Sequence, residues 1–197
     1  MNFDAARTYI LDRLSKELPK DLYYHRIEHT FDMYEAALRL IELENADPHS
    51  AMLIETAALY HDAGMIHSYR DHEFSSEAMI RDILPEFDYN PDEIEEIAEL
   101  IRVTKMPQAA VTHNQMIICD ADLDALGRED FFITSFQLQL EWKLYNILDT
   151  TIEQWFKFEI DFLKNHHYYT ASARKLRDEK KNENLKEMER LLGIINS

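Results

Sequence analysis

The sequence predicts an all-α protein, and two observations support that fold class. Apolar residues recur at intervals of three and four along most of the chain, as at Ile27, Phe31, Tyr34, Leu38 and Ile41. This is the period of a helix that buries one face. The chain also lacks segments that alternate between apolar and polar residues, and it lacks hairpin turn signals, so we expect no strands.

Proline and glycine mark the helix boundaries in the first half of the chain. Proline lacks the backbone N–H that a helix needs, so Pro19 and Pro85 end two helices, and Gly64 is a natural stop for a third. The segment 63–72 has the composition of a loop. We expect helices at about 10–18, 27–41, 50–62 and 73–83.

The second half opens on a strong helix start, Asn90-Pro91-Asp92-Glu93. Asparagine caps free backbone N–H groups, proline suits the first turn, and the acids face the positive end of the helix dipole. We expect this helix to end before Pro107, and further helices at 116–126, closed by Gly127, and at 128–148, 152–165 and 171–192, with Thr150 and Thr170 as caps. No repeat or linker divides the chain, so a single helical domain over residues 1–197 is expected.

The composition excludes several classes of function. The net charge of −17 argues against a nucleic acid polymer or an anionic membrane as partner, because both require a positive surface. With three glycines, the chain contains neither a dinucleotide-binding fingerprint nor a glycine-rich phosphate loop. The single cysteine, Cys119, suits a reducing cytoplasm. We see no signal peptide and no apolar run near the ~20 residues of a spanning helix, so we expect a cytoplasmic protein.

Two pairs of polar residues are candidates for a metal site. His25 and His29 lie four residues apart and project from one helix face, beside an apolar stripe. His61 and Asp62 follow the apolar run 57–60, so a buried position is expected. A buried, unpaired carboxylate is costly, and a divalent cation bound by imidazole and carboxylate removes that cost. The structural alternatives are a polar helix face for the first pair and backbone hydrogen bonds for Asp62.

Three further acids, Asp120, Asp122 and Asp124, lie inside an apolar segment. Asp120 and Asp124 share one helix face, while Asp122 lies on the opposite face together with Ile118 and Ala125. We therefore expect Asp122 to point into the core. The other two are expected near solvent or as caps of neighbouring elements.

These motifs, in this order, resemble the HD-domain superfamily of metal-dependent phosphohydrolases. The similar segments are Tyr24-His25-Arg26-Ile27-Glu28-His29, the pair His61-Asp62, Ala121-Asp122-Leu123 and Arg70-Asp71-His72-Glu73. The resemblance implies an HD-like helical bundle at about 22–127, followed by C-terminal helices at about 128–197. It also implies a divalent metal ion held by His29, His61, Asp62 and Asp122.

Two departures from the family pattern bear on the metal and on the reaction. Some members bind a second metal through a histidine in the segment that reads Ile101-Arg102-Val103-Thr104-Lys105 here, so we expect one ion. Some nucleotidases place a glutamate where this chain has Met65. Manganese, zinc, iron, magnesium, nickel and cobalt are not distinguished by the residue types.

The resemblance implies hydrolysis of a phosphoester, in a nucleotide or another small phosphorylated metabolite, by a metal-activated water. Asp62 would orient the water, and His72 would be an added ligand or the proton donor to the leaving oxygen. Arg26, Arg70 and Lys105 are candidate phosphate contacts. The alternatives are a catalytically weak metal or nucleotide sensor, an HD-type iron oxygenase and a purely structural helical module. A homo-oligomer is compatible with the sequence.

Overall fold

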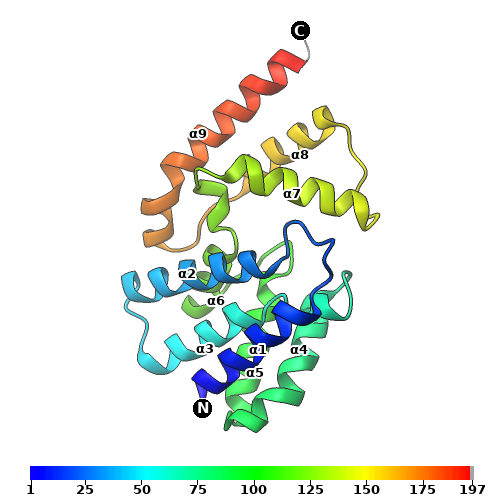
Figure 1. Ribbon diagram of the computed structural model, residues 1–197. Helices are drawn as coiled ribbons and strands as arrows, with labels where there is room; N and C mark the ends of the chain where they lie inside the picture. Colours follow the sequence, from blue (N-terminus) through cyan, green and yellow to red (C-terminus); the bar gives the residue numbers. More distant parts are fainter. Residues whose placement is uncertain (196–197) are drawn as a thin grey trace.

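The computed structural model describes residues 1–195, and every regular element in that part of the chain is helical (Figure 1). The all-α prediction is therefore confirmed. The α-helices are α1 (Phe3–Glu17), α2 (Ile27–Leu43), α3 (Pro48–Tyr60), α4 (His72–Ile83), α5 (Pro91–Thr104), α6 (His113–Asp122), α7 (Phe131–Leu144), α8 (Ile152–Asn165) and α9 (Ala171–Ile195). Three short 3₁₀ turns are η1 (Ala63–Ile66), η2 (Leu84–Phe87) and η3 (Asp124–Gly127). None of the helices in residues 1–195 combines the length and apolar character needed to cross a membrane.

Helix α3 is the centre of the first half of the fold. It packs against α1, α2, α5 and α6, and its last eight residues are almost all buried. The hydroxyl of Tyr60, at its end, donates to the carbonyl oxygen of Ala6 in α1 at 2.9 Å. A helix that is apolar on all sides belongs inside a bundle. The residues that follow α3, His61 and Asp62, are therefore delivered into the interior.

Helices α7 to α9 lie together beyond this bundle, at the top of Figure 1. They have their own apolar cluster around Trp155, Phe131 and Met188. Helix α9 joins the two parts because it packs closely against η3. The side chain of Asn184 donates to the carbonyl oxygens of Leu126 and Arg128, each at 3.0 Å.

Several helix boundaries differ from the sequence prediction because caps decide them. Helix α3 begins at Pro48 rather than Ser50, since the Asp47 side chain accepts from the N–H groups of residues 49 and 50. The predicted helix 116–126 is in fact α6 followed by η3, and α6 begins earlier because Thr112 and Gln115 form a capping box.

The cap of α8 was also assigned to the wrong threonine. Thr151, not Thr150, accepts from the N–H of Gln154 and forms a capping box with it. The Thr150 hydroxyl instead accepts from the Gln139 side chain of α7 at 3.1 Å. Thr170 behaves as predicted, since its hydroxyl oxygen accepts from the N–H of Ala173 in the first turn of α9.

Gly64 permits the close approach of α4 to η1. A Cβ at this position would overlap the carbonyl oxygen of His72 and lie 2.7 Å from the backbone nitrogen of Ser76. We expect Gly64→Ala to lower the free energy of unfolding by about 1–3 kcal/mol, the usual effect of overpacking. Gly193→Ala is the matched control, because its Cβ would meet open space in α9. Alanine at position 193 should raise the free energy of unfolding by roughly 0.5–1 kcal/mol, because alanine favours the helix more than glycine does. Urea unfolding of both variants checks this, and equal stabilities would contradict it.

Candidate metal centre

Six histidine and aspartate side chains that could bind a metal converge where α2, α3, α4 and α6 meet. They form two groups, His29, His61 and Asp122 in one, and His25, Asp62 and His72 in the other. Within each group, the ligand atoms all lie within 4.8 Å of one another. The structure thus brings together all four residues expected to hold a metal, and it places His25 and His72, which were also candidates, beside them.

Asp62 lies between the two groups. Its Oδ2 atom is 3.0 Å from Nε2 of His61 and 3.4 Å from Nε2 of His29, and its Oδ1 atom is 3.1 Å from Nε2 of His72. Oδ2 is buried and has no hydrogen-bond partner in residues 1–195. The backbone hydrogen bonds considered as an alternative are therefore absent from this oxygen within the described chain. A buried orphan oxygen surrounded by imidazole nitrogens fits a bound cation.

The histidines are held so that their Nε2 atoms face the site. Nδ1 of His61 lies 2.9 Å from the carbonyl oxygen of Ala58, and Nδ1 of His72 lies 3.0 Å from that of Tyr69. Because a carbonyl oxygen can only accept, each ring carries a hydrogen on Nδ1. Nε2 then faces the site, where it can bind a metal in a neutral ring or donate a hydrogen bond in a protonated ring.

The electrostatics of the site favour positive charge. Burial lowers the pKa of His29, but the carboxylates of Asp122 and Asp62 outweigh it and raise that pKa to about 10. Burial alone would raise the pKa of Asp62, whereas the neighbouring imidazoles of His61 and His25 hold it well below its usual value. The two carboxylates therefore attract positive charge, which a proton on an imidazole or a metal ion can supply.

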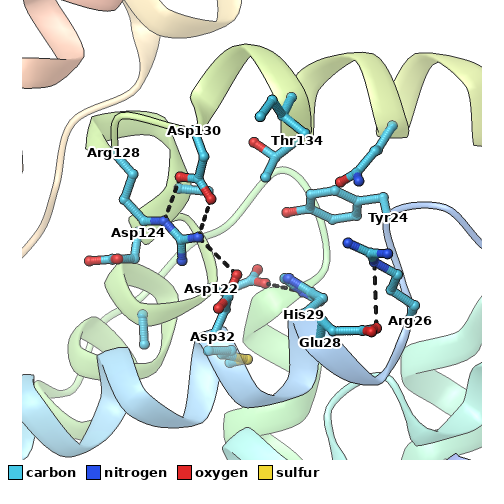
Figure 2. A pocket seen from close by; sticks show the side chains of 15 residues that line it. Tyr24, Arg26, Glu28, His29, Asp32, Asp122, Asp124, Arg128, Asp130 and Thr134 are labelled. Carbon is cyan, nitrogen blue, oxygen red and sulfur yellow. Dashed lines mark hydrogen bonds and ion pairs between the residues drawn. The ribbon is translucent and has the colours of Figure 1, made fainter.

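The three acids of the 120–124 segment lie in two different settings. Asp122 is at the site, with Oδ1 3.7 Å from Nε2 of His29 (Figure 2). Its Oδ2 accepts from the Gln108 side chain at 3.0 Å. Asp120 and Asp124 do not lie near solvent, since they are only 1% and 5% exposed, and Asp120 follows the other expectation because it accepts from backbone N–H groups just before α9. The C-terminal segment covers both of them.

Each of these two acids is satisfied by the C-terminal segment. Asp120 accepts from the backbone N–H groups of Tyr169 and Thr170 and from the Thr170 hydroxyl, each at 2.7 Å. Asp124 accepts two hydrogen bonds from Arg177 of α9, at 2.7 and 2.8 Å. Both carboxylates therefore have structural roles that account for their burial.

The three candidate phosphate contacts lie in different places. Arg26 lines a small pocket of about 120 Å³ beside His29 and Asp122, where it pairs with Glu28 (Figure 2). Lys105 lines a larger cavity on the other side of the centre and pairs with Asp71. Arg70 donates to the carbonyl oxygen of Asn146 and lines neither of these two cavities.

The small pocket also contains an arginine that the sequence analysis missed. Arg128 lies across from Arg26, between the carboxylates of Asp130 and Asp32 (Figure 2). It follows Gly127 directly, at the end of η3. No local motif marks it, since its position at the pocket depends on how η3 and α7 pack.

The larger cavity has a volume of about 590 Å³ and connects the centre with the C-terminal helices. One end is lined by His61, Asp62, His72 and Asp122. The other end is lined mainly by apolar side chains of η3, α7 and α8, among them Leu126, Phe131, Leu138, Trp142, Phe158 and Phe162. The C-terminal helices, which carried no predicted site residue, therefore form much of the wall.

Glu141 of α7 fixes the loop that carries His25. Its carboxylate is fully buried and accepts from the backbone N–H groups of Tyr23, Tyr24 and His25, at 2.8, 2.8 and 3.1 Å. It also contacts Nδ1 of His25 and accepts from the hydroxyl of Tyr69 at 2.8 Å. Burial alone would raise the pKa of this carboxyl, but these partners hold it below its usual value.

Glu159 of α8 is a buried acid in a different setting. It is 4% exposed and lines the larger cavity. Its Oε1 accepts from the Ser135 hydroxyl at 2.9 Å, and that hydroxyl accepts from the indole N–H of Trp155, also at 2.9 Å. Burial raises the pKa of this carboxyl to about 7, although the Ser135 hydrogen bond acts in the opposite direction.

Comparison with known proteins points to one family. A family model of the HD domain matches residues 26–125, which is just over half of the chain. An uncharacterized protein of Clostridium beijerinckii is 34% identical over an alignment of 101 residues. The alignment covers 49% of this chain and 63% of that relative, which is less than two thirds of its length. A crystal structure of a predicted HD superfamily hydrolase from an uncultured Thermotogales bacterium superposes with a TM-score of 0.63 and 22% identity. The superposition covers 94% of this chain and 91% of the Thermotogales chain. At this sequence identity the similarity shows a shared fold only.

We expect Glu141→Gln to destabilise the protein. The amide retains the shape of the side chain but removes the charge, and its NH₂ group cannot accept from the backbone donors around it. Losing charge-assisted hydrogen bonds of this kind costs about 1.5–3 kcal/mol. Glu99→Gln is the control, since Glu99 is exposed on α5, and a change within about 0.5 kcal/mol is expected. Equal denaturation midpoints for the two variants would show that Glu141 does not secure the loop.

The raised pKa of Glu159 predicts a pH-dependent stability. Between pH 4.5, the ordinary value for glutamate, and about 7, the folded protein binds more protons at this site than the unfolded chain. Stability should therefore fall as the pH rises through this window, by about 3 kcal/mol. Glu159→Gln should remove this contribution and unfold at higher denaturant concentration than wild type at pH 8. Glu99→Gln should retain the wild-type slope. An unchanged slope in Glu159→Gln would refute the assignment.

Proposed function

The chain belongs to the HD-domain family, and from that premise we propose that it is a metal-dependent hydrolase of phosphoesters. His29, His61, Asp62 and Asp122 would hold one divalent ion. The observation that carries this proposal is the buried Oδ2 atom of Asp62, which has no hydrogen-bond partner in residues 1–195 and is surrounded by imidazole nitrogens. Imidazole and carboxylate ligands together suit borderline transition metals and zinc.

The bound ion would lower the pKa of a water molecule and polarise the phosphoryl group. Asp62 would orient that water, because its two oxygens face different histidines. His72 would donate a proton to the leaving oxygen. Burial lowers the pKa of His72, but Asp62 outweighs it and raises that pKa to about 9, which favours the doubly protonated ring at neutral pH.

The phosphoester would enter through the larger cavity. Lys105, which lies beside Met106 and Pro107 in its wall, is the candidate phosphate contact on this side. Arg26 is the candidate on the side of the small pocket. Arg70 would not contact the phosphate, because its guanidinium donates to the carbonyl oxygen of Asn146 and it lines neither cavity.

A second group of ligands favours one rival function. His25, Asp62 and His72 are close enough to hold a second ion, as a two-iron oxygenase of this family would require. In this chain, however, His25 is already engaged by Glu141. We therefore propose a single resident ion. Elemental analysis that finds two irons per chain, without phosphoester turnover, would replace the hydrolase proposal by the oxygenase.

Substitution of the paired residues tests the proposal. We expect His61→Ala and Asp62→Asn each to lose most of the bound metal and to reduce turnover of p-nitrophenyl phosphate and nucleoside monophosphates by at least about 100-fold. His113→Ala is the matched control, because His113 is exposed at the start of α6 and pairs with Glu44. It should keep metal and turnover. Full activity and full metal content in His61→Ala would contradict the proposal. Tight nucleotide binding by the wild-type protein without turnover would favour a sensor.

A further inference from the structure

Aromatic rings surround a single acid in the part of the larger cavity formed by α7 and α8. Trp142, Phe158 and Phe162 line this part together with Glu159. The centroids of Trp142 and Phe158 are 5.5 Å apart with their planes at 64°, and Phe158 stacks on Phe162 with centroids 6.5 Å apart. Rings in such a cluster present negatively polarised faces, which attract cations.

The carboxylate of Glu159 has an unused oxygen. Oε1 accepts from Ser135, whereas Oε2 accepts no hydrogen bond from any residue in 1–195. Glu159 is 96% buried, yet it lines the cavity, so Oε2 is not enclosed by protein atoms in the way that Oδ2 of Asp62 is. No ion pair with Glu159 occurs in the described part of the chain. A buried carboxylate in apolar surroundings without a cation is an unfavourable arrangement.

Structural roles do not account for this acid. The contrast is with the other buried acids of the fold, since Asp124 pairs with Arg177 and Glu141 accepts several hydrogen bonds. A glutamine at position 159 would satisfy Ser135 equally well, because its carbonyl oxygen accepts hydrogen bonds. The charge of Glu159 therefore has a partner only if a ligand supplies one.

The aromatic part and the metal centre belong to one continuous space. The same cavity of about 590 Å³ is lined by Asp62 at one end and Glu159 at the other. Tyr24 lines this cavity as well. The ring of Tyr24 lies 4.7 Å from that of His29. A volume of this size suits a whole small-molecule ligand, of which a phosphoryl group would occupy only one end.

We propose that the aromatic part of the cavity binds an organic ammonium group that carries at least one N–H. The ammonium would donate to Oε2 of Glu159 and lie against the rings of Trp142, Phe158 and Phe162. This inference rests on the proposed function where it concerns the substrate, which would then be a phosphoester of an amino alcohol or aminoalkyl phenol. Its phosphoryl group would lie at the metal centre and its amine at Glu159.

A binding experiment tests the ammonium site without relying on catalysis. The probes are 2-phenylethylamine and its neutral analogue 2-phenylethanol, titrated into the full chain and followed by calorimetry and by the fluorescence of the tryptophans. We expect the amine to bind at least about tenfold more tightly than the alcohol in wild type and in Glu99→Gln. In Glu159→Gln this difference should disappear. Equal binding of both probes to wild type, or a preference retained in folded Glu159→Gln, would overturn the inference.

A second pair of probes connects the site to the reaction. 4-(2-Aminoethyl)phenyl phosphate and 4-ethylphenyl phosphate differ only in the amine, and we expect wild type to prefer the first in kcat/KM by at least about tenfold. Glu159→Gln should lose this preference and still hydrolyse 4-ethylphenyl phosphate. Turnover of both esters without preference would overturn the amine assignment and leave the hydrolase proposal intact. Absence of turnover together with Glu159-dependent amine binding would overturn the hydrolase proposal and leave the ammonium site intact.

Discussion

A buried carboxylate at the end of the central helix sets the requirements for its neighbours. Helix α3 is apolar on all sides, so Asp62 enters the interior directly behind it, where an ionised carboxylate needs compensation. The compensation comes from imidazoles of three elements, His29, His61 and His72. Their orientation depends in turn on backbone carbonyl oxygens that accept from the opposite ring nitrogens of His61 and His72. The helical core thus positions the Asp62 carboxylate and orients the surrounding imidazoles toward it.

The C-terminal helices complete this arrangement through buried charges of their own. Glu141 holds the loop of His25, and Asp120 accepts hydrogen bonds from backbone and hydroxyl groups that immediately precede α9. Asp124, next to the metal-site helix α6, pairs with Arg177 of α9. Removing the groups that satisfy these acids would leave buried charges short of partners, which is destabilising. The C-terminal helices therefore support the centre physically and do more than extend the chain.

Sequence reasoning located the residues whose signals are local. His29, His61, Asp62 and Asp122 lie in or beside apolar runs, where a polar residue is unusual, and the structure brings them together. Glu141 and Glu159 gave no such signal, because a glutamate on an amphipathic helix ordinarily faces solvent.

Long-range packing accounts for what the local pattern left out. Glu141 is buried by a loop more than a hundred residues away in sequence. Long-range packing also buries Asp120 and Asp124, for which a position near solvent was one of two expectations. A helix-face argument assumes one buried side, and α9 together with the segment before it covers the other.

Asp62 and Glu159 are opposite cases of one physical problem. The chain supplies imidazoles for the first, and in residues 1–195 it supplies only a single hydroxyl for the second. The ionised form of Glu159 lowers the stability of the free protein near neutral pH, so a ligand that stabilises this form also stabilises the fold. Binding of an ammonium would lower the pKa of Glu159 and release a proton from part of the molecules. Occupancy of the aromatic end of the cavity would then be linked to pH without any change in the metal centre.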